Sequence, residues 1–234
     1  YYTTAFKLYS VILGFFTAFT NVMLPRMSSL LANGEKDRFQ ELVNRSFSVM
    51  ATCCIPLILC SMIMAPQIVY ILSGPGYEGA ILPMRIIMPA AFAVGVAQVL
   101  AIQVLMPMKK DKVLLIASII GAVVSLLINL LVVPSVKSVG SAVVLLCSEM
   151  GVTGMYVWYV LSQELILIPI KAIGKNVLFS LPSVVICLGC GRWIDNELLG
   201  VGCAVVLAGI LWMLLQIIIR SLVGERIKNL FFKI

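Results

Sequence analysis

Long apolar stretches alternate with short polar breaks along the whole chain. Each stretch is about 20 residues long, the length that an α-helix needs to cross the hydrocarbon core of a bilayer. We therefore predict an all-α integral membrane protein, a polytopic bundle of about seven transmembrane helices. The predicted spans, of which the sixth is the shortest, are residues 4–31, 47–72, 81–106, 113–133, 139–161, 177–191 and 198–219.

Composition agrees with this pattern. Hydrophobic residues make up 62% of the chain and charged residues only 12%, with a mean hydropathy of +1.11, which excludes an ordinary soluble domain. The chain begins at Tyr1 with neither an initiator Met nor a leader pattern, so we expect it to be part of a longer protein. No connection is long enough to fold alone, so the function is expected within the bilayer.

Basic residues gather in alternate connections, on one predicted side of the membrane. They are Arg26, Lys36, Arg38, Arg45, Lys109, Lys110, Lys112, Lys171, Lys175, Arg220, Arg226, Lys228 and Lys233. The positive-inside rule makes this side cytoplasmic, so we expect the chain to begin outside and its C-terminus to lie in the cytoplasm. The net charge of +7 then reflects contact with anionic membrane lipids and does not indicate a nucleic-acid partner.

Two segments between spans predict the division of the chain. Residues 163–176, with Pro169 and Gly174, predict a cytoplasmic interfacial linker. It separates five helices (1–162) from a terminal helix pair with a short basic tail (177–234). Residues 35–45 are amphipathic, so we expect the second helix to extend into the cytoplasmic interface.

The first span carries polar and small residues at intervals of three and four. Lys7, Ser10, Gly14, Thr17 and Asn21 therefore share one helical stripe. Polar groups within a span are expected to face a bundle interior or a water-filled cavity. The alternative is a small-residue packing face, with the Lys7 amine reaching the outer headgroups.

Arg85 opens the third span, at the same predicted outer level as Lys7. Two cations at one level suit a phosphate or diphosphate, because guanidinium binds two oxygens and ammonium acts as a point charge. The alternative is that Arg85 anchors its helix at the headgroups. We take Lys7, Arg85 and Asn21 as the candidate substrate-binding residues.

Glu149 lies in the middle of the fifth span, too deep to reach water. A carboxylate there is expected to be protonated or paired with a cation. Such an acid is a candidate for coupling transport to a proton or sodium gradient. The alternative is a static pair with a basic residue elsewhere in the protein.

Other chemistry finds little support in the sequence. The absence of His removes the usual general base and metal ligand, and no nucleotide-binding loop of the Walker type occurs. Cys187 and Cys190 form a C-x-x-C, but no second pair completes a metal site, and all seven Cys lie in apolar runs. We predict no metal, no cofactor and no catalytic residue.

Several short motifs occur in a recognisable order. They are Tyr2-x-x-Ala5-x-Lys7-Leu8, Leu24-Pro25-Arg26-Met27-Ser28, Gly74-Pro75-Gly76-Tyr77, Leu82 to Ile86, Val99-Leu100 with Gln103-Val104-Leu105, and Gly140-Ser141-Ala142 leading to Ser148-Glu149. Together they resemble the second lobe of polysaccharide (O-antigen) flippases in the MATE-like multidrug/oligosaccharidyl-lipid/polysaccharide exporter superfamily. The match covers about residues 1–163, and the terminal pair resembles the family only in number and place.

The resemblance implies two six-helix lobes plus a terminal pair, with this chain as the C-terminal half and the N-terminal half as its partner. It implies a flippase that moves an undecaprenyl-diphosphate-linked oligosaccharide across the bacterial cytoplasmic (inner) membrane by ion-coupled alternating access. Its product would serve cell-surface polysaccharide, such as the O-antigen of lipopolysaccharide. Lys7 and Arg85 would belong to a cationic lumen, and Glu149 to coupling with a proton or sodium ion.

Other functions stay open at this stage. A MATE-type drug/cation antiporter would need an acidic lumen, whereas this chain offers Lys7 and Arg85 against Glu149. An integral-membrane polysaccharide polymerase or ligase would be expected to carry a long outward-facing loop with Arg, His or acidic residues, and the predicted outer connections are short. A purely structural membrane subunit is a further alternative, and the sequence holds no readable code for a particular oligosaccharide.

Overall fold

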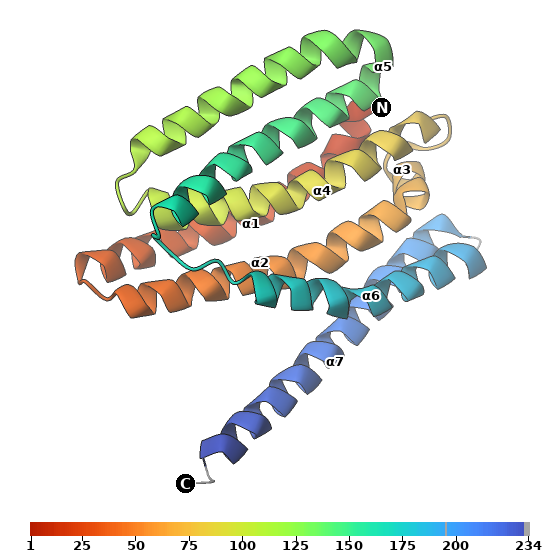
Figure 1. Ribbon diagram of the computed structural model, residues 1–234. Coiled ribbons are helices and arrows are strands. Elements are labelled where there is room, and N and C mark those ends of the chain that lie inside the picture. The colour runs from red at the N-terminus through yellow and green to blue at the C-terminus, as the bar shows by residue number, and fades with distance from the viewer. Residues whose placement is uncertain (195, 232–234) are drawn as a thin grey trace.

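The computed structural model describes the backbone of residues 1–194 and 196–231, and the side chains of residues 1–170, 173–194, 196–212 and 214–215. Its regular elements are helices that run back and forth in a bundle (Figure 1). In chain order they are α1 (Tyr2–Ala32), α2 (Lys36–Ile63), α3 (Ala65–Ser73), a 3₁₀ helix (Glu78–Ala80), α4 (Ile81–Gln98), a π-helix (Val99–Leu105), α5 (Asp111–Ser162), α6 (Ile170–Trp193) and α7 (Glu197–Phe231). The predicted all-α class is confirmed.

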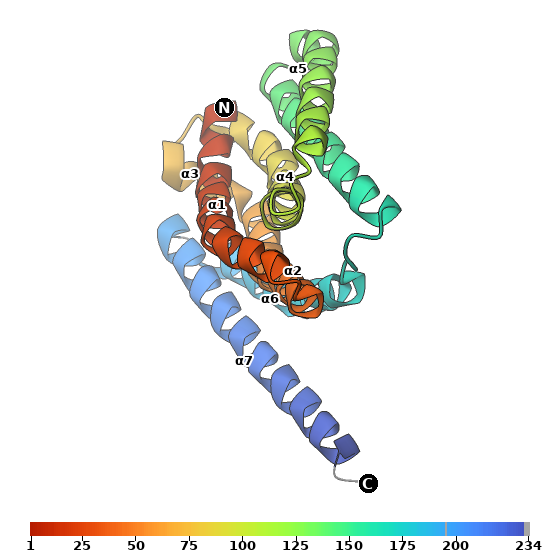
Figure 2. The ribbon, with the colours of Figure 1, turned by 90° about the vertical axis from the view of Figure 1, so that its left-hand side faces the viewer.

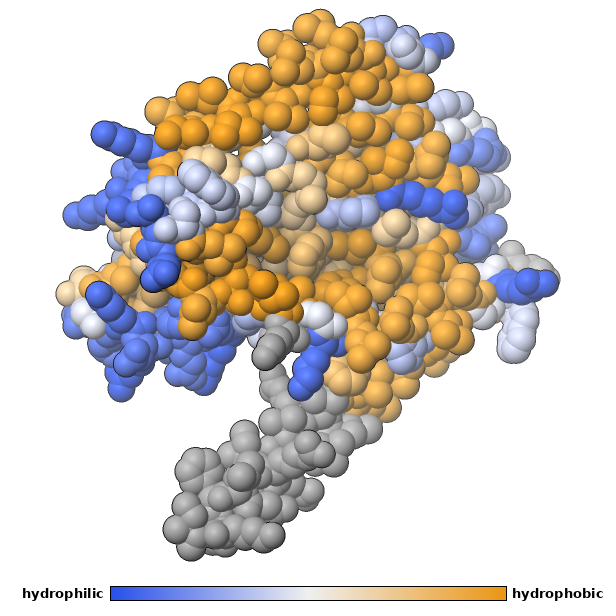
Figure 3. Space-filling view, viewed as in Figure 1, coloured by the Kyte–Doolittle hydropathy of each residue, from blue (hydrophilic) through white to orange (hydrophobic). Residues whose placement is uncertain are grey.

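Most of these helices are long and apolar enough to cross a bilayer. Within the described residues, the candidate spans are Tyr2–Ala32, Lys36–Ile63, Glu78–Leu105, Asp111–Ser162 and Ile173–Trp193, and Glu197–Trp212 is a shorter apolar helix. Apolar side chains form a broad band over the bundle, and hydrophilic ones gather mainly at the two ends of its helices (Figure 3). The chain is a multi-pass integral membrane protein.

Helix α5 is a hairpin, and its two arms are the predicted fourth and fifth spans (Figure 1). The chain reverses at Lys137, whose φ of 49° and ψ of −118° are not helical. The arms approach closely at Gly140, where an added Cβ would lie 2.9 Å from the Cα of Val133. Farther along, Ser148 Oγ donates a hydrogen bond of 3.0 Å to the carbonyl of Gly121. Small residues thus let the arms pack against each other in lipid.

The predicted second span is broken into α2 and α3. Helix α2 begins at Lys36, which confirms the expected extension before residue 47, and it ends at Ile63. The break lies just before Pro66, which is in the first turn of α3. Proline has no N–H to donate to a carbonyl of the preceding turn, and its ring crowds that turn. Pro56, by contrast, lies inside the continuous helix α2.

Helix α4 forms the centre of the bundle. It packs against α1, α2 and α5, which surround it in Figure 2. Leu82 and Arg85 are its only exposed residues, and both lie near its first turn. Gly95 allows close contact, because an added Cβ there would lie 3.0 Å from Met50 Sδ and 3.5 Å from Phe16. Helix α4 is therefore the central element against which α1, α2 and α5 are placed.

The terminal pair α6 and α7 packs together and lies against α2 and α3 (Figure 1). The segment before it is held by Gln40 of α2, whose Nε2 donates to the carbonyl of Leu167 and whose Oε1 accepts from the N–H of Leu167, each at 2.9 Å. Helix α6 begins at Ile170, so the sixth span starts earlier than the predicted residue 177. Hydropathy did not indicate these first turns of α6, because they carry the charged residues Lys171 and Lys175.

The predicted alternation of sides agrees with the arrangement of the helices. The connections after α1, after the π-helix and after α5 lie at one end of the bundle, at the left of Figure 1. The break in α5, the end of α6, the beginning of α7 and the N-terminus lie at the other end. The basic connections after spans one, three and five thus share one end. Lys233, in the predicted basic tail, lies outside the described residues.

Candidate functional site

One side of α1 is open and polar. Lys7, Ser10, Gly14 and Asn21 are exposed and Thr17 is half-buried, so most of the predicted stripe lies away from the core of this chain. We call these five residues the polar stripe. Its hydroxyls bond along their own helix, Ser10 Oγ to the Lys7 carbonyl at 2.7 Å and Thr17 Oγ1 to the Leu13 carbonyl at 2.9 Å. The stripe is therefore available to contact something outside the described helices.

A second exposed side of α1 is apolar and lies next to the polar stripe. Val11, Phe15 and Val22 are 70%, 53% and 76% exposed. The core side of the helix consists mainly of Ala5, Tyr9, Ile12 and Phe16. A lipid-facing helix needs only apolar exposed residues, so two unlike exposed sides indicate two different surroundings. The apolar side suits acyl chains, and the polar stripe suits a hydrated cavity.

An amide from α4 extends the polar stripe into the bundle. Gln98 Nε2 donates to Thr17 Oγ1 at 3.0 Å, and the Gln98 Oε1 lies 3.0 Å from Thr20 Oγ1. The Thr20 hydroxyl also lies 2.8 Å from the Phe16 carbonyl, and it can donate to either oxygen. These bonds join α1 to α4. The sequence reading overlooked Gln98 and Thr20, although a lone amide in an apolar span was a usable signal.

Arg85 has a local structural partner. Its Nε donates a hydrogen bond of 3.1 Å to the Met62 carbonyl, near the end of α2. In a continuous helix that carbonyl would accept from the residue four positions on, but this residue is Pro66, which has no N–H. Arg85 thus supplies the donor that the break between α2 and α3 lacks, while its side chain stays exposed.

Lys7 and Arg85 point to different sides of the bundle. Nine residues separate Lys7 from Phe16, which faces α4, so the two lie about 180° apart around α1. Thirteen residues separate Arg85 from Gln98, which faces α1, so these lie about 140° apart around α4. We therefore treat each cation as a separate candidate, and the predicted anion-binding pair stays a prediction.

Glu149 lies on the second arm of α5 and is partly buried. It interacts electrostatically with Tyr9 of α1 and with Tyr156, two turns along its own helix. It forms no ion pair with any side chain that the structure describes. A static pair among the described residues is thus not seen, and pairing with another part of the protein stays open.

Gln103, whose side-chain amide is buried, is a further residue that the sequence did not indicate as functional. It lies in the π-helix, its side chain is fully buried, and its Nε2 and Oε1 have no hydrogen-bond partner among the described groups. Segments of π-helix recur near functional sites, because the extra residue turns side chains in a new direction. The unpaired amide marks this end of α4 as unusual for a packed core.

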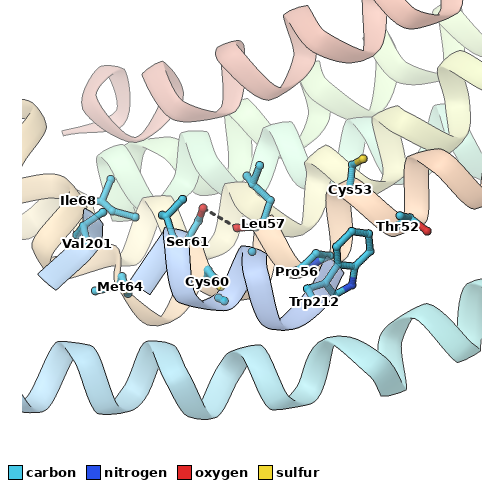
Figure 4. Close-up of a pocket in the computed structure, with 13 residues that line it drawn as sticks. Thr52, Cys53, Pro56, Leu57, Cys60, Ser61, Met64, Ile68, Val201 and Trp212 are labelled. Carbon is cyan, nitrogen blue, oxygen red and sulfur yellow. Dashed lines mark hydrogen bonds between the residues drawn. The ribbon is translucent and has the colours of Figure 1, made fainter. Parts of the chain in front are cut away.

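A separate apolar cavity of about 310 Å³ lies between α2, α3 and α7 (Figure 4). Cys60, Ser61 and Met64 line it from the α2 side, and Val201 and Trp212 from α7. Ser61 Oγ is bonded to the Leu57 carbonyl at 2.7 Å. No candidate substrate or coupling residue lines this cavity, and its walls suit hydrocarbon better than an anion.

Comparison with known proteins gives the family. The sequence model described as Lipid II flippase MurJ matches residues 1–199 of this chain. The Putative O-antigen transporter of Escherichia coli (strain K12) is 28% identical over 154 residues, which are 65% of this chain and 37% of that protein. The match to a family of flippases, which are transporters, confirms the resemblance drawn from the short motifs.

A solved structure shares the fold. "Lipid II flippase MurJ, inward closed conformation" matches with a TM-score of 0.76 at 16% identity, covering 93% of this chain and 46% of that one. At this identity the likeness shows the fold alone. The chain spans less than half the length of both the curated relative and this structure.

Proposed function

Since this chain belongs to the Lipid II flippase MurJ family, we propose that it forms the second lobe and terminal helix pair of a flippase for an undecaprenyl-diphosphate-linked oligosaccharide. The protein would work in the bacterial cytoplasmic membrane, with the basic connections and the C-terminus in the cytoplasm. The lipid-linked oligosaccharide, the N-terminal half and membrane lipids would be its partners. The single observation that carries the proposal is the open polar stripe beside a lipid-facing side on α1.

The stripe would line a lumen between this lobe and the N-terminal half. A diphosphate carries negative charge through the bilayer, and a cation in a partly dehydrated lumen compensates for the water that the diphosphate loses. Lys7 provides that cation, and Asn21, about four helical turns farther along α1, provides an uncharged donor on the same stripe. Arg85 would act from the other side of α4, in addition to its bond to Met62.

Glu149 would couple the cycle to an ion. A partly buried carboxylate changes its preferred surroundings when it takes up a proton or binds sodium, so its state can bias one lobe arrangement over another. It lies on the second arm of α5 and interacts electrostatically with Tyr9 of α1, the helix that carries the stripe. The coupling ion is a proton or sodium.

The substrate has two candidates. The curated relative is named for O-antigen transport and the family for lipid II, and both substrates are lipid-linked. The 28% identity to the curated relative supports an O-antigen type of oligosaccharide, with lipid II as the second candidate. The family match favours either of these over a drug/cation antiporter, a polymerase or ligase, or a structural subunit.

The test is complementation with the full-length gene. One Escherichia coli strain would lack its O-antigen flippase and the other would be depleted of its lipid II flippase. Surface polysaccharide is assayed in the first and growth in the second, with membrane levels checked by immunoblot. Rescue of the first strain alone supports the O-antigen type of substrate, and rescue of the second alone assigns lipid II. Failure in both strains at normal membrane levels would contradict the flippase proposal for these substrates.

Point variants in the rescued strain test the residues. Lys7→Ala should reduce rescue roughly 10-fold or more, because a charge-assisted contact contributes about 1.5–3 kcal/mol. Lys7→Arg should retain much of the activity. Lys36→Ala, which removes an exposed cation at the start of α2, is the matched control and should be neutral. Equal rescue by Lys7→Ala and Lys36→Ala would remove Lys7 from the lumen.

Two further variants complete the set. Glu149→Gln should lower flipping and flatten its dependence on the proton or sodium gradient, which can be collapsed separately with selective ionophores in membrane vesicles. Asn21→Ala should have a smaller effect than Lys7→Ala, since it loses an uncharged contact. A Glu149→Gln variant that keeps the full gradient dependence would exclude Glu149 from coupling.

A further inference from the structure

Two cysteines from distant parts of the chain lie in contact. The Cys187 thiol of α6 donates to Cys60 Sγ of α2, with the sulfur atoms 2.8 Å apart and 127 residues between them in sequence. This separation is within about 1 Å of the length of a disulfide bond. The C-x-x-C of Cys187 and Cys190 had no apparent second pair in the sequence, and the fold provides a partner from α2.

The surroundings give the two thiols unequal access. Cys187 is fully buried, packed with Met64, Ala204 and Ala208 between the terminal pair and α2. Cys60 is partly exposed and lines the cavity of about 310 Å³ (Figure 4). A small apolar reagent that enters the cavity thus reaches Cys60 first, and Cys187 lies behind Cys60 at contact distance.

Both thiols lie toward the same end of the bundle. Cys60 is three residues before the end of α2 and Cys187 six residues before the end of α6, which are axial distances of about 4.5 and 9 Å. This is the end opposite the basic connections. If those connections are cytoplasmic, the pair lies toward the oxidising side, where disulfides persist.

We propose that Cys60 and Cys187 form a reversible disulfide that fastens the terminal helix pair to α2. With a small disulfide RSSR as oxidant, the Cys60 thiolate attacks one sulfur, forming a mixed disulfide and releasing one RS⁻. The Cys187 thiolate then attacks Cys60 Sγ, which forms the Cys60–Cys187 bond and releases the second RS⁻. Two thiols lose two electrons and two protons, and one RSSR becomes two RSH.

The bond has a defined mechanical effect. Apart from this pair, side-chain hydrogen bonding between α2 and α6 includes Thr52 Oγ1 to Asn176 Oδ1, at 3.1 Å, a bond that can break and re-form. A disulfide would hold the two helices at one register. Any movement of the terminal pair along α2 would stop until the bond is reduced.

The experiment uses the full-length protein in membranes, with a protease site inserted between Gln163 and Glu164, which are both exposed. Membranes are treated with 4,4′-dipyridyl disulfide, quenched with N-ethylmaleimide and cleaved, and the products are separated on a non-reducing gel. Cleavage places Cys60 and Cys187 on different fragments. We expect the fragments to stay joined in most molecules and to separate after a reductant is added.

Serine variants assign the pair. Cys60→Ser and Cys187→Ser should abolish the joined product, whereas the matched control Cys190→Ser, one turn along α6 from Cys187, should leave it unchanged. Thermal melting of each variant confirms that it is folded. Separate fragments in the wild type, under conditions where mass spectrometry shows Cys60 modified by the reagent, would overturn the proposal. Loss of the joined product in Cys190→Ser, with retention in Cys187→Ser, would overturn it as well.

Discussion

The close approach of the two α5 arms at Gly140 predicts a sharp difference between two glycine substitutions. In Gly140→Ala the new methyl would lie 2.9 Å from Val133 Cα and 3.2 Å from both Val133 N and the Val132 carbonyl oxygen. Ordinary contacts between carbon atoms are about 3.5–4.0 Å. The crowded atoms belong to the backbone and cannot rotate away, so the arms must separate.

The magnitude follows from a matched comparison. Gly154 lies on the same arm, and an added Cβ there meets nothing within 4 Å. Alanine gains about 1 kcal/mol of helix propensity over glycine at both positions, so this gain cancels between the variants. Overpacking of a close contact costs about 1–3 kcal/mol. We therefore expect Gly140→Ala to be less stable than Gly154→Ala by about 1–3 kcal/mol.

The assay is thermal unfolding of the full-length protein in detergent, followed with a maleimide dye that becomes fluorescent on reacting with thiols. The buried Cys54 and Cys187 are 1% and 0% exposed, so the dye reports their exposure on unfolding. Gly140→Ala should melt roughly 2–6 °C below Gly154→Ala. Equal melting temperatures, or a higher one for Gly140→Ala, would refute the reasoning from the close approach.

Two other substitutions test roles that the structure assigns. Arg85→Leu removes the donor to the Met62 carbonyl at the break after α2 and should lower the melting temperature by the equivalent of about 1 kcal/mol, with Arg85→Lys less affected. An unchanged melting temperature for Arg85→Leu would show that water replaces the guanidinium. Gln103→Leu removes a fully buried amide without a described partner, so it should raise stability by about 1–3 kcal/mol in the same assay. A fall instead would show that a group outside the described residues satisfies this amide.

Several parts of the fold were predictable from local sequence. Hydropathy located the helices because crossing a bilayer requires a run of apolar residues of a definite length. The two arms of α5 were predicted as separate spans, 113–133 and 139–161, and the reversal lies between them at Lys137. The predicted sixth span begins at residue 177, whereas α6 begins at Ile170, because its first turns carry Lys171 and Lys175 and hydropathy cannot tell a charged helical turn from a linker.

Contacts between distant residues were not predictable in the same way. Thr17 and Gln98 are 81 residues apart, and Cys60 and Cys187 are 127 apart. The local sequence around each of these residues does not indicate which distant residue it contacts. The sequence indicated the candidate residues Lys7, Asn21, Arg85 and Glu149 because a polar or charged side chain inside a bilayer costs free energy, and this cost depends on residue type alone. Their roles as lumen or coupling residues stay predictions.

The sequence by itself thus determined the helical class, the approximate spans, the shared side of the basic connections and the resemblance to a flippase family. Only the tertiary structure decided which side of each helix is buried. It left the polar stripe of α1 open, turned Lys7 and Arg85 to different sides, and brought Cys60 against Cys187. The physical reason is that lipid is as apolar as a protein core, so a membrane helix that is apolar all round carries no periodic signal for its buried side. That side is chosen by close packing at residues such as Gly95, and packing is a property of the assembled bundle.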